Sequence, residues 1–367
     1  MIPEKQNKIN RKRAKSETLN VVAVDLFCGV GGLTYGLIKA GIPVSAGIDM
    51  DDSCRFAYER NNRTDFIHKN IKEIEGEELN ELFPENATKI LVGCAPCQPF
   101  SRHTHKNRQR GEDEEWGLLY QFSRLIKQIK PTVVSMENVP DIVKHKVFHD
   151  FTDRLKSLGY HVFWKAIFCP NYGIPQNRTR LVLLASKLGD IQMLPPTHKQ
   201  EKYRTVKDAI VNLEPLKAGE VSKKDPLHKA PNLDAINLQR IKNSKPGGSW
   251  KDWERELRAR CHRRRSGKTY SSVYARMSWD KPSPTITTQF YRFGTGRFGH
   301  PAQDRALSLR EGALLQTFPK KYKFYDWKTP FSFKNIGAHI GNAVPVRLGL
   351  IIGKSIKKHL EQYSYAK

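Results

Sequence analysis

From Asn20 onward the chain alternates short apolar runs with stretches of helical periodicity, and no other feature limits the fold as strongly. Apolar runs of strand length occupy residues 21–27, 44–48, 90–93, 132–136, 162–168 and 180–185. Stretches with apolar residues at helical spacing lie between several of them, at 32–40, 51–61, 117–129 and 141–158. Strands that alternate with helices are typical of a doubly wound, mostly parallel sheet, so we predict an α/β fold.

The alternation stops near Leu194, which two prolines follow. Residues 195–275 contain few apolar runs, more proline and glycine, and many charges. We interpret this region as a second domain or a large insertion. Beyond it, we expect helices at 308–315 and 345–360.

The charge of the chain indicates a polyanionic partner. Its 367 residues include 63 Lys and Arg against 37 Asp and Glu, a net charge of +26. This excess favours nucleic acid over a membrane surface, and no uninterrupted apolar run reaches the roughly 18 residues of a membrane-spanning helix. With 38% apolar residues, the chain is unlike an intrinsically disordered protein.

Residues 1–19 form a basic arm that lacks the apolar core and cleavage site of a secretory signal. Scattered cysteines indicate reduced thiols in a cytosolic protein rather than a disulfide framework. They are Cys28, Cys54, Cys94, Cys97, Cys169 and Cys261. We therefore expect a basic, globular, cytoplasmic protein.

A glycine-rich turn, Asp25-Leu-Phe-Cys-Gly29-Val-Gly31-Gly32, follows the first predicted strand and opens the first predicted helix. Such a turn lets the backbone approach a ligand and directs helix N–H groups at it. Asp49 ends the second predicted strand, where a carboxylate can accept hydrogen bonds from ribose hydroxyls. Thr34 stands where the dinucleotide pattern needs a small residue, which disfavours NAD or FAD. The alternatives are a tight turn required for packing and another nucleoside cofactor, of which S-adenosylmethionine is the first candidate.

A Cys-x-x-Cys sequence, Cys94-Ala-Pro96-Cys97, follows the predicted strand at 90–93 and continues as Gln98-Pro99-Phe100-Ser101. Pro99 disfavours a thioredoxin-like redox pair, because it stands where that motif begins a helix. A zinc site needs a second pair of ligands, and none stands at ligand spacing. Two interpretations remain: a pair of buried structural thiols, or a nucleophile, Cys97, in a proline-braced loop at the carboxyl end of the sheet.

Charged residues also flank two later apolar runs. Glu137 follows the run at 132–136, on the edge expected to hold Cys97, and a partly desolvated carboxyl there can donate a proton. The alternative for Glu137 is a helix cap. Arg178 and Arg180 open the next apolar run, either as edge charges that deter aggregation or as ligands of a phosphate or a carbonyl.

Taken together, six ordered motifs resemble those of the DNA (cytosine-5)-methyltransferases of bacterial restriction-modification systems. They are DLFCGVGGLTYGL, GIDMD, GCAPCQPFS, ENVP, QNRTR and GNAVP, and they span Asp25 to Pro345. The segments RMSWDKPSPTITT (276–288) and LSLREGALLQTFP (307–319) are also similar to the family. The resemblance implies a Rossmann-like S-adenosylmethionine-dependent methyltransferase sheet with a smaller target-recognition domain. It divides the chain into a basic arm (1–19), a catalytic and cofactor-binding domain (20–190), a target-recognition domain (191–334) and a C-terminal segment that returns to the catalytic domain (335–367).

The resemblance also implies a cofactor site and no metal. The residues it assigns to the cofactor are Asp25, Phe27, Gly29, Gly31, Gly32, Asp49, Met50, Asn70, Ile71, Pro96, Leu118, Asn342 and Val344. Met50 would pack on the adenine, and Asn342 would close the site. The family usually has Asp-Ile where this chain has Asn70-Ile71, and an asparagine oxygen can still accept the hydrogen bond of the adenine amino group.

The implied reaction methylates carbon 5 of a cytosine in double-stranded DNA. Cys97 would add to carbon 6 of the ring, and Glu137 would hydrogen-bond or protonate ring nitrogen 3. Arg180 would hold the cytosine carbonyl, with Arg178 and Gln98 in support. Because a stacked duplex shields carbon 6, the base must be flipped out of the helix. The resemblance assigns substrate contacts to Gln176, Ser101, Asn138 and Val139.

In the family, the region between QNRTR and RMSWDKPSPT, here about 195–275, reads the DNA sequence, and its Lys and Arg can contact phosphates. The implied protein is a monomer on the nucleoid of a bacterial or phage-infected cell, paired in function with a restriction endonuclease and without a membrane. One alternative is an RNA (tRNA) cytosine-5 methyltransferase, which GNAVP disfavours. Another is a catalytically inactive DNA-binding homologue, which the retained Cys97, Glu137, Gly29 and Gly31 disfavour.

Overall fold

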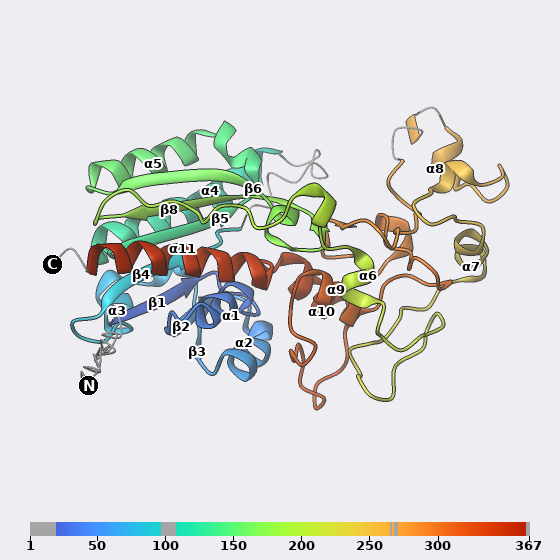
Figure 1. Ribbon diagram of the computed structural model, residues 1–367, viewed down its shortest axis with the longest axis horizontal. Helices are drawn as coiled ribbons and strands as arrows, with labels where there is room; N and C mark the ends of the chain where they lie inside the picture. The colour runs from blue at the N-terminus through green and yellow to red at the C-terminus, as the bar shows by residue number, and fades with distance from the viewer. Residues whose placement is uncertain (1–19, 97–107, 265, 268–270, 365–367) are drawn as a thin grey trace, which may run out of the picture.

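The computed structural model describes residues 20–96, 108–264, 266–267 and 271–364, and of 108–116 and 364 it describes the backbone alone (Figure 1). The predicted basic arm and the predicted site residues Cys97, Gln98 and Ser101 lie outside the described residues.

A seven-stranded sheet organises the first half of the chain, in the order β3-β2-β1-β4-β5-β8-β6. Its strands are β1 (Val21–Leu26), β2 (Val44–Asp49), β3 (Asp65–His68), β4 (Thr88–Gly93), β5 (Val133–Asn138), β6 (His161–Phe168) and β8 (Thr179–Ser186). The first five strands are parallel to their neighbours, whereas β8 runs antiparallel to both β5 and β6. The predicted α/β class is confirmed.

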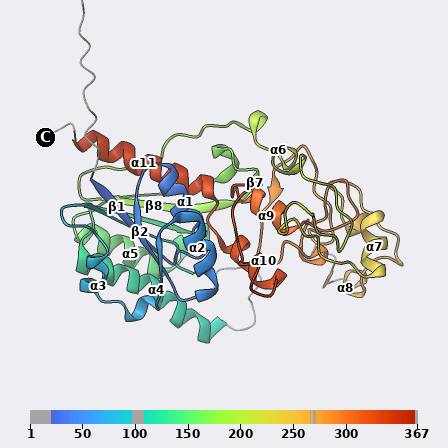
Figure 2. The same cartoon turned by 90° about the horizontal axis from the view of Figure 1, so that it is seen from below.

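Helices cover both faces of this sheet (Figure 2). One face carries α3 (Gly76–Glu81), α4 (Arg108–Ile129) and α5 (Lys146–Ser157). The other carries α1 (Gly32–Lys39) and α11 (Val346–Ser364). Side chains of β1 alternate between the two cores, because successive residues of a strand point to opposite faces.

The C-terminal helix is therefore part of the same layered unit as β1. Ile352 and Ile356 of α11 are fully buried in one core with Ala23 of β1 and Leu37 of α1. The run Phe333–Tyr363 is apolar and long enough to cross a membrane by composition, but 67% of its most apolar window is buried inside the protein. Burial of this kind is what a core helix of a globular protein shows.

Between β8 and α11 the chain is largely irregular, with short elements that lie to one side of the sheet (Figure 1). The α-helices among its described residues are α6 (Val206–Ile210), α7 (Ala235–Lys242), α8 (Arg260–Arg263), α9 (Leu309–Leu315) and α10 (Phe333–Asn342). Its strand β9 (Ser283–Pro284) pairs with β7 (Gln176–Asn177), which precedes β8. A small aromatic core holds part of this region together: Ile241, Trp250, Trp253, Phe293 and Ala306. The domain boundaries at 191 and 334 stay a prediction.

One predicted helix is divided in the structure. Instead of a helix over 141–158, a 3-10 helix (Pro140–Lys144) precedes α5. His145 between them is extended, with φ −114° and ψ 143°. The first half of the chain also contains α2 (Arg55–Asn62), which a 3-10 turn (Asp52–Cys54) precedes.

Candidate active site

Four predicted site segments follow parallel strands at one edge of the sheet. The glycine turn follows β1, Met50 follows β2, the Cys94 loop follows β4, and Glu137 and Asn138 end β5. These strands are parallel neighbours, so their carboxyl ends meet at the same edge. Open α/β sheets bind their ligands at that edge.

Glycine is required at two positions of the turn between β1 and α1. Gly31 has a φ of +84°, and a Cβ added there would lie 2.3 Å from Nδ2 of Asn62. A Cβ at Gly32 would lie 2.3 Å from the backbone oxygen of Val344. The turn therefore packs directly on α2 and on the segment after α10, which brings Gly31, Gly32 and Val344 together as predicted site residues.

The start of the same turn has a left-handed backbone at two further residues. Gly29 has a φ of +50°, and Phe27 has a φ of +59°. A positive φ is uncommon for a bulky residue, and such conformations cluster at ligand sites. The conformation of Phe27 is consistent with the predicted cofactor contact.

Asp49 fastens this turn to the end of β2. Its Oδ2 accepts a hydrogen bond from the backbone N–H of Gly29 at 2.8 Å, and its Oδ1 accepts one from that of Asp51 at 2.9 Å. Burial raises the pKa of the Asp49 carboxyl. The next residue, Met50, leaves 64% of its surface exposed. A planar base packed on Met50 would remove that apolar surface from water.

Asp25 is a buried carboxyl with one unsatisfied oxygen. It is 1% exposed, and its Oδ2 accepts a hydrogen bond of 2.6 Å from the hydroxyl of Thr34. Its Oδ1 has no hydrogen-bond partner among the described residues, and burial raises the pKa of Asp25 from 3.8 to about 7. A cationic ligand group would satisfy such an oxygen, and S-adenosylmethionine carries an ammonium group. The buried acid and the close-packed glycine turn thus fit the cofactor that the motifs imply.

The raised pKa of Asp25 predicts a pH-dependent stability. Between about pH 4 and pH 7 the folded chain holds a proton on Asp25 that the unfolded chain releases. The contribution of Asp25 to the free energy of unfolding is therefore greatest below pH 4. It decreases as the pH rises from 4 to 7 and is lost above pH 7. Asp25→Asn keeps the shape without the charge, so at pH 8 its free energy of unfolding should exceed that of the wild type, by at most about 4 kcal/mol.

Urea unfolding of both proteins without cofactor, at pH 4, 6 and 8, measures this difference. We expect the gap between Asp25→Asn and the wild type to widen steadily with pH. A gap that is the same at pH 4 and pH 8 would show that Asp25 has an ordinary pKa.

Other predicted cofactor residues approach the same edge from further along the chain. Oδ1 of Asn70 caps a 3-10 helix (Ile71–Glu73) by accepting a hydrogen bond of 3.1 Å from the N–H of Lys72, so this oxygen already has one partner. Ile71 is buried, and Leu118 lies half-buried on α4 against the same apolar core. Asn342 is the exposed last residue of α10, and Pro96 is the last described residue before Cys97.

Glu137 stands at the centre of the polar side chains on this edge. It is 3% exposed, and Nε of Arg180 lies 3.0 Å from its Oε1. This contact is an ion pair without hydrogen-bond geometry, and Oε1 has no hydrogen-bond partner in the described part of the chain. Its Oε2 accepts a hydrogen bond from Sγ of Cys94 at 2.6 Å. The carboxyl is thus held by two neighbouring segments while one oxygen can still accept.

Arg178 and Gln176 contact the protein instead of the open edge. Nη1 of Arg178 approaches the backbone oxygens of Ile286 at 3.2 Å and Gly341 at 3.5 Å, and burial lowers the pKa of Arg178 to about 10. The amide of Gln176 donates to the backbone oxygen of Leu315 at 3.1 Å and accepts from the N–H of Ile286 at 3.0 Å. Both residues join the strand segment to the C-terminal helices, and the support that Arg178 is expected to give the reaction stays a prediction.

Asn138 connects Glu137 to the cysteine loop. Its side-chain amide donates to the backbone oxygen of Ala95 at 3.3 Å, and its Oδ1 accepts from the N–H of Val139 at 2.8 Å. The family resemblance assigns substrate contacts to Asn138 and Val139. The structure also gives Asn138 a part in fixing the segment that leads to Cys97.

One cluster of described residues has metal-ligating side chains. The ligand atoms of Asp51, Cys54 and His339 lie within 4.8 Å of one another, beside Asp49 and Met50. Nε2 of His339 already contacts the hydroxyl of Ser53 at 2.9 Å and Oδ2 of Asp51 at 3.5 Å. The cluster therefore links α10 to the end of β2 through its own contacts, and the expected absence of a metal stays a prediction.

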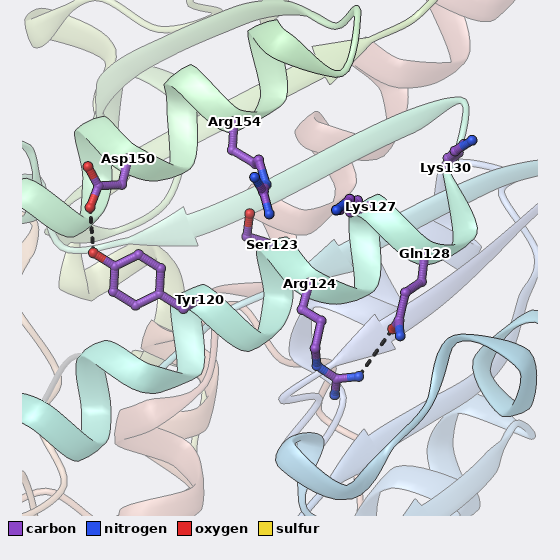
Figure 3. Close-up of a pocket in the computed structure, with 8 residues that line it drawn as sticks. All are labelled: Tyr120, Ser123, Arg124, Lys127, Gln128, Lys130, Asp150 and Arg154. Carbon is purple, nitrogen blue, oxygen red and sulfur yellow. Dashed lines mark hydrogen bonds between the residues drawn. The ribbon is translucent and has the colours of Figure 1, made fainter.

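A separate cavity opens between α4 and α5 (Figure 3). Its lining residues are Tyr120, Ser123, Arg124, Lys127, Gln128, Lys130, Asp150 and Arg154. The hydroxyl of Tyr120 donates to Asp150 at 2.5 Å, and Nη1 of Arg124 donates to Gln128 at 3.1 Å. None of the predicted site residues lines this cavity, so it is distinct from the candidate active site.

Sequence reasoning passed over two contacts of the site. Thr34 disfavoured a dinucleotide turn, but nothing in the sequence pattern predicted the hydrogen bond that its hydroxyl donates to Asp25. Cys94 was noticed as half of a Cys-x-x-Cys sequence, and nothing in that spacing indicated a contact with Glu137. Both partners are brought together only by the alignment of neighbouring segments.

Comparisons with known proteins agree with the geometry. The family model described as C-5 cytosine-specific DNA methylase matches residues 21–358. The type II methylase M.HgiDII of Herpetosiphon aurantiacus is 56% identical over 341 residues, which cover 92% of this chain and 95% of that protein. The type II methyltransferase M.PspPI of a Psychrobacter species is 34% identical, over 92% of this chain and 79% of that protein.

Solved structures share the fold. An Escherichia coli prophage protein described as a DNA modification methyltransferase superposes with a TM-score of 0.72 at 21% identity, over 93% of this chain and 99% of that one. An Entamoeba histolytica methyltransferase superposes with a TM-score of 0.64 at 15% identity, over 93% and 99% of the two chains.

Proposed function

The chain belongs to the C-5 cytosine-specific DNA methylases, and from that membership we propose that it methylates carbon 5 of a flipped cytosine within one short sequence of double-stranded DNA. The observation that carries the proposal is the buried Glu137, ion-paired with Arg180 on the same sheet edge as the glycine turn. A carboxyl group at this position can protonate a nucleobase while a cofactor binds to the neighbouring glycine turn.

Cys97 is proposed as the nucleophile. Carbon 5 of cytosine is a poor nucleophile, so electrons must first be moved into the ring. A bond from the Cys97 thiolate to carbon 6 supplies them. Loss of the proton from carbon 5 and departure of the thiol later restore the aromatic ring.

Glu137 is proposed to hydrogen-bond or protonate ring nitrogen 3 of the cytosine. Its Oε1 has no hydrogen-bond partner among the described residues, so this oxygen can form a hydrogen bond to the cytosine. The nearby guanidinium of Arg180 is proposed to hold the cytosine carbonyl as well as the carboxyl of Glu137.

The family depends on S-adenosylmethionine, which when bound supplies an electrophilic methyl group to carbon 5. Asp25 and the turn from Phe27 to Gly32 are proposed to hold its amino-acid part. Asp49 is proposed to accept from the ribose hydroxyls, and Met50 to pack on the adenine.

The region 195–275 is proposed to read the DNA sequence, and its many Lys and Arg suit a phosphate backbone. The relatives named type II methylases support pairing with a restriction endonuclease whose site the methylation protects. We propose a monomer that works on DNA in the bacterial cytoplasm.

Mass spectrometry of nucleosides tests this function. The purified full-length chain is incubated with S-adenosylmethionine and unmethylated plasmid DNA, and in parallel with transfer RNA. We expect 5-methyldeoxycytidine from the DNA and no methylated cytidine from the RNA. Methylation of the RNA alone would make the chain an RNA methyltransferase, and no methylation of either would contradict the proposal.

A further inference from the structure

Three side chains from adjacent segments of the sheet meet at one carboxyl group. Cys94 follows β4, Glu137 lies on β5, and Arg180 lies on β8, and these strands are neighbours in the order β4-β5-β8. Sγ of Cys94 is 2.6 Å from Oε2 of Glu137, and Nε of Arg180 is 3.0 Å from Oε1. The two oxygens of the carboxyl are therefore contacted from opposite sides.

Contacts on both oxygens fix the plane of the carboxyl. A glutamate with one partner can rotate about its terminal bond, because that torsion is broad. Arg180 is itself held, since its Nη1 donates to the backbone oxygen of Thr179 at 2.8 Å. Cys94 starts from a fixed backbone, since its N–H donates to the backbone oxygen of Leu26 at 3.3 Å. Neither contact moves freely with Glu137.

We propose that Cys94 is a positioning residue, whose protonated thiol holds Oε2 of Glu137 so that Oε1 faces the cytosine. The inference rests on the proposed function, because only that function places a cytosine against Glu137. A carboxylate has about four lone-pair sites, and the thiol occupies one of those on Oε2. The unsatisfied Oε1 is left in a fixed direction toward ring nitrogen 3, to which Glu137 is proposed to give its proton.

The inference separates the two thiols of the Cys-x-x-Cys sequence by role. Cys97 would form the bond to carbon 6, whereas Cys94 would form no bond to the substrate. A serine at position 94 can donate a hydrogen bond as the thiol does, and an alanine cannot. Comparing these two variants therefore tests donation itself, apart from packing.

Single-turnover methylation by the full chain, with saturating DNA and S-adenosylmethionine, is the measurement. We expect Cys94→Ala to slow the methylation rate by roughly tenfold, the effect of losing one hydrogen bond to a charged group. Cys94→Ser should stay within about threefold of the wild type, by the same reasoning. Dissociation constants for DNA and cofactor should be unchanged in both variants.

Cys169→Ala is the matched control. Cys169 is a fully buried thiol in the adjacent 3-10 helix (Cys169–Tyr172), and its side chain forms no hydrogen bond to Glu137 in the described structure. It should methylate at the wild-type rate. Should alanine at position 94 prevent folding, Cys94→Val gives the same comparison with serine, because valine also lacks a donor.

A Cys94→Ala protein as fast as the wild type would overturn the inference, and so would a Cys94→Ser protein as slow as Cys94→Ala. Covalent capture on DNA that contains 5-fluorocytosine checks the division of roles, since Cys94→Ala should still be captured. If the wild type itself methylates no DNA, the proposed function fails instead, so the two failures are distinguishable.

Discussion

Replacing Cys97 by serine is expected to lower the rate of DNA methylation by about 10⁴-fold or more, as loss of the nucleophile does in other enzymes. A thiol has a pKa near 8.5 and is partly ionised at neutral pH, whereas a serine hydroxyl stays protonated and is a far weaker nucleophile. Transfer of labelled methyl groups from S-adenosylmethionine to DNA, followed over hours, measures the remaining rate.

Covalent capture provides the control for that result. Fluorine at carbon 5 cannot leave as a proton does, so the enzyme should stay bonded to a 5-fluorocytosine duplex after methyl transfer. Wild-type protein should give a band of protein bound to DNA in a denaturing gel, and Cys97→Ser should give none while still binding the duplex. Full activity in Cys97→Ser would eliminate Cys97 as the nucleophile.

Replacing Glu137 by glutamine is expected to lower the single-turnover rate by roughly 10²- to 10³-fold, the usual range for a lost general acid. Glutamine keeps the shape of the side chain and can still contact Arg180, but it has no proton to exchange with ring nitrogen 3. Cofactor binding should be unchanged, because the glycine turn follows β1 and Asp49 ends β2, whereas Glu137 lies on β5.

Calorimetric binding of S-adenosylmethionine to Glu137→Gln distinguishes chemistry from assembly of the site. A normal dissociation constant with a slow rate supports the assigned role. A rate close to that of the wild type would show that proton transfer at nitrogen 3 does not depend on Glu137.

Much of the candidate site could be predicted because its residues stand at strand ends that the apolar pattern marks. Gly29, Asp49 and Glu137 each follow or end a predicted parallel strand, so the topology places them on one edge. The contact of Arg180 with Glu137 could not be predicted in this way, since β8 is antiparallel to β5. Nothing in an apolar run of eight residues distinguishes a parallel from an antiparallel neighbour.

Other elements carried too weak a signal. β3 (Asp65–His68) has four residues, of which only Phe66 is buried. It completes the sheet edge by pairing with β2, a tertiary contact that leaves little trace in local sequence. The cap of Asn70 and the bond between Asp25 and Thr34 likewise depend on which segments become neighbours.

The region after β8 was least predictable, for a physical reason. Its core depends on three large aromatic side chains, Trp250, Trp253 and Phe293, which stand on or next to 3-10 helices of three residues rather than on long periodic strands or helices. Periodicity predicts structure only where a regular element buries one face. The charge of residues 195–275 could be predicted to suit DNA, but the arrangement of these residues could not.

Bisulfite sequencing of genomic DNA shows whether the chain methylates cytosine at one DNA sequence in cells. The chain is expressed in a bacterial host without cytosine methylation of its own, beside a host that expresses Cys97→Ser. We expect unconverted cytosines confined to one short sequence with the wild type, and complete conversion with Cys97→Ser. Complete conversion in the host that expresses soluble wild-type protein would show that the chain does not methylate cytosine in DNA.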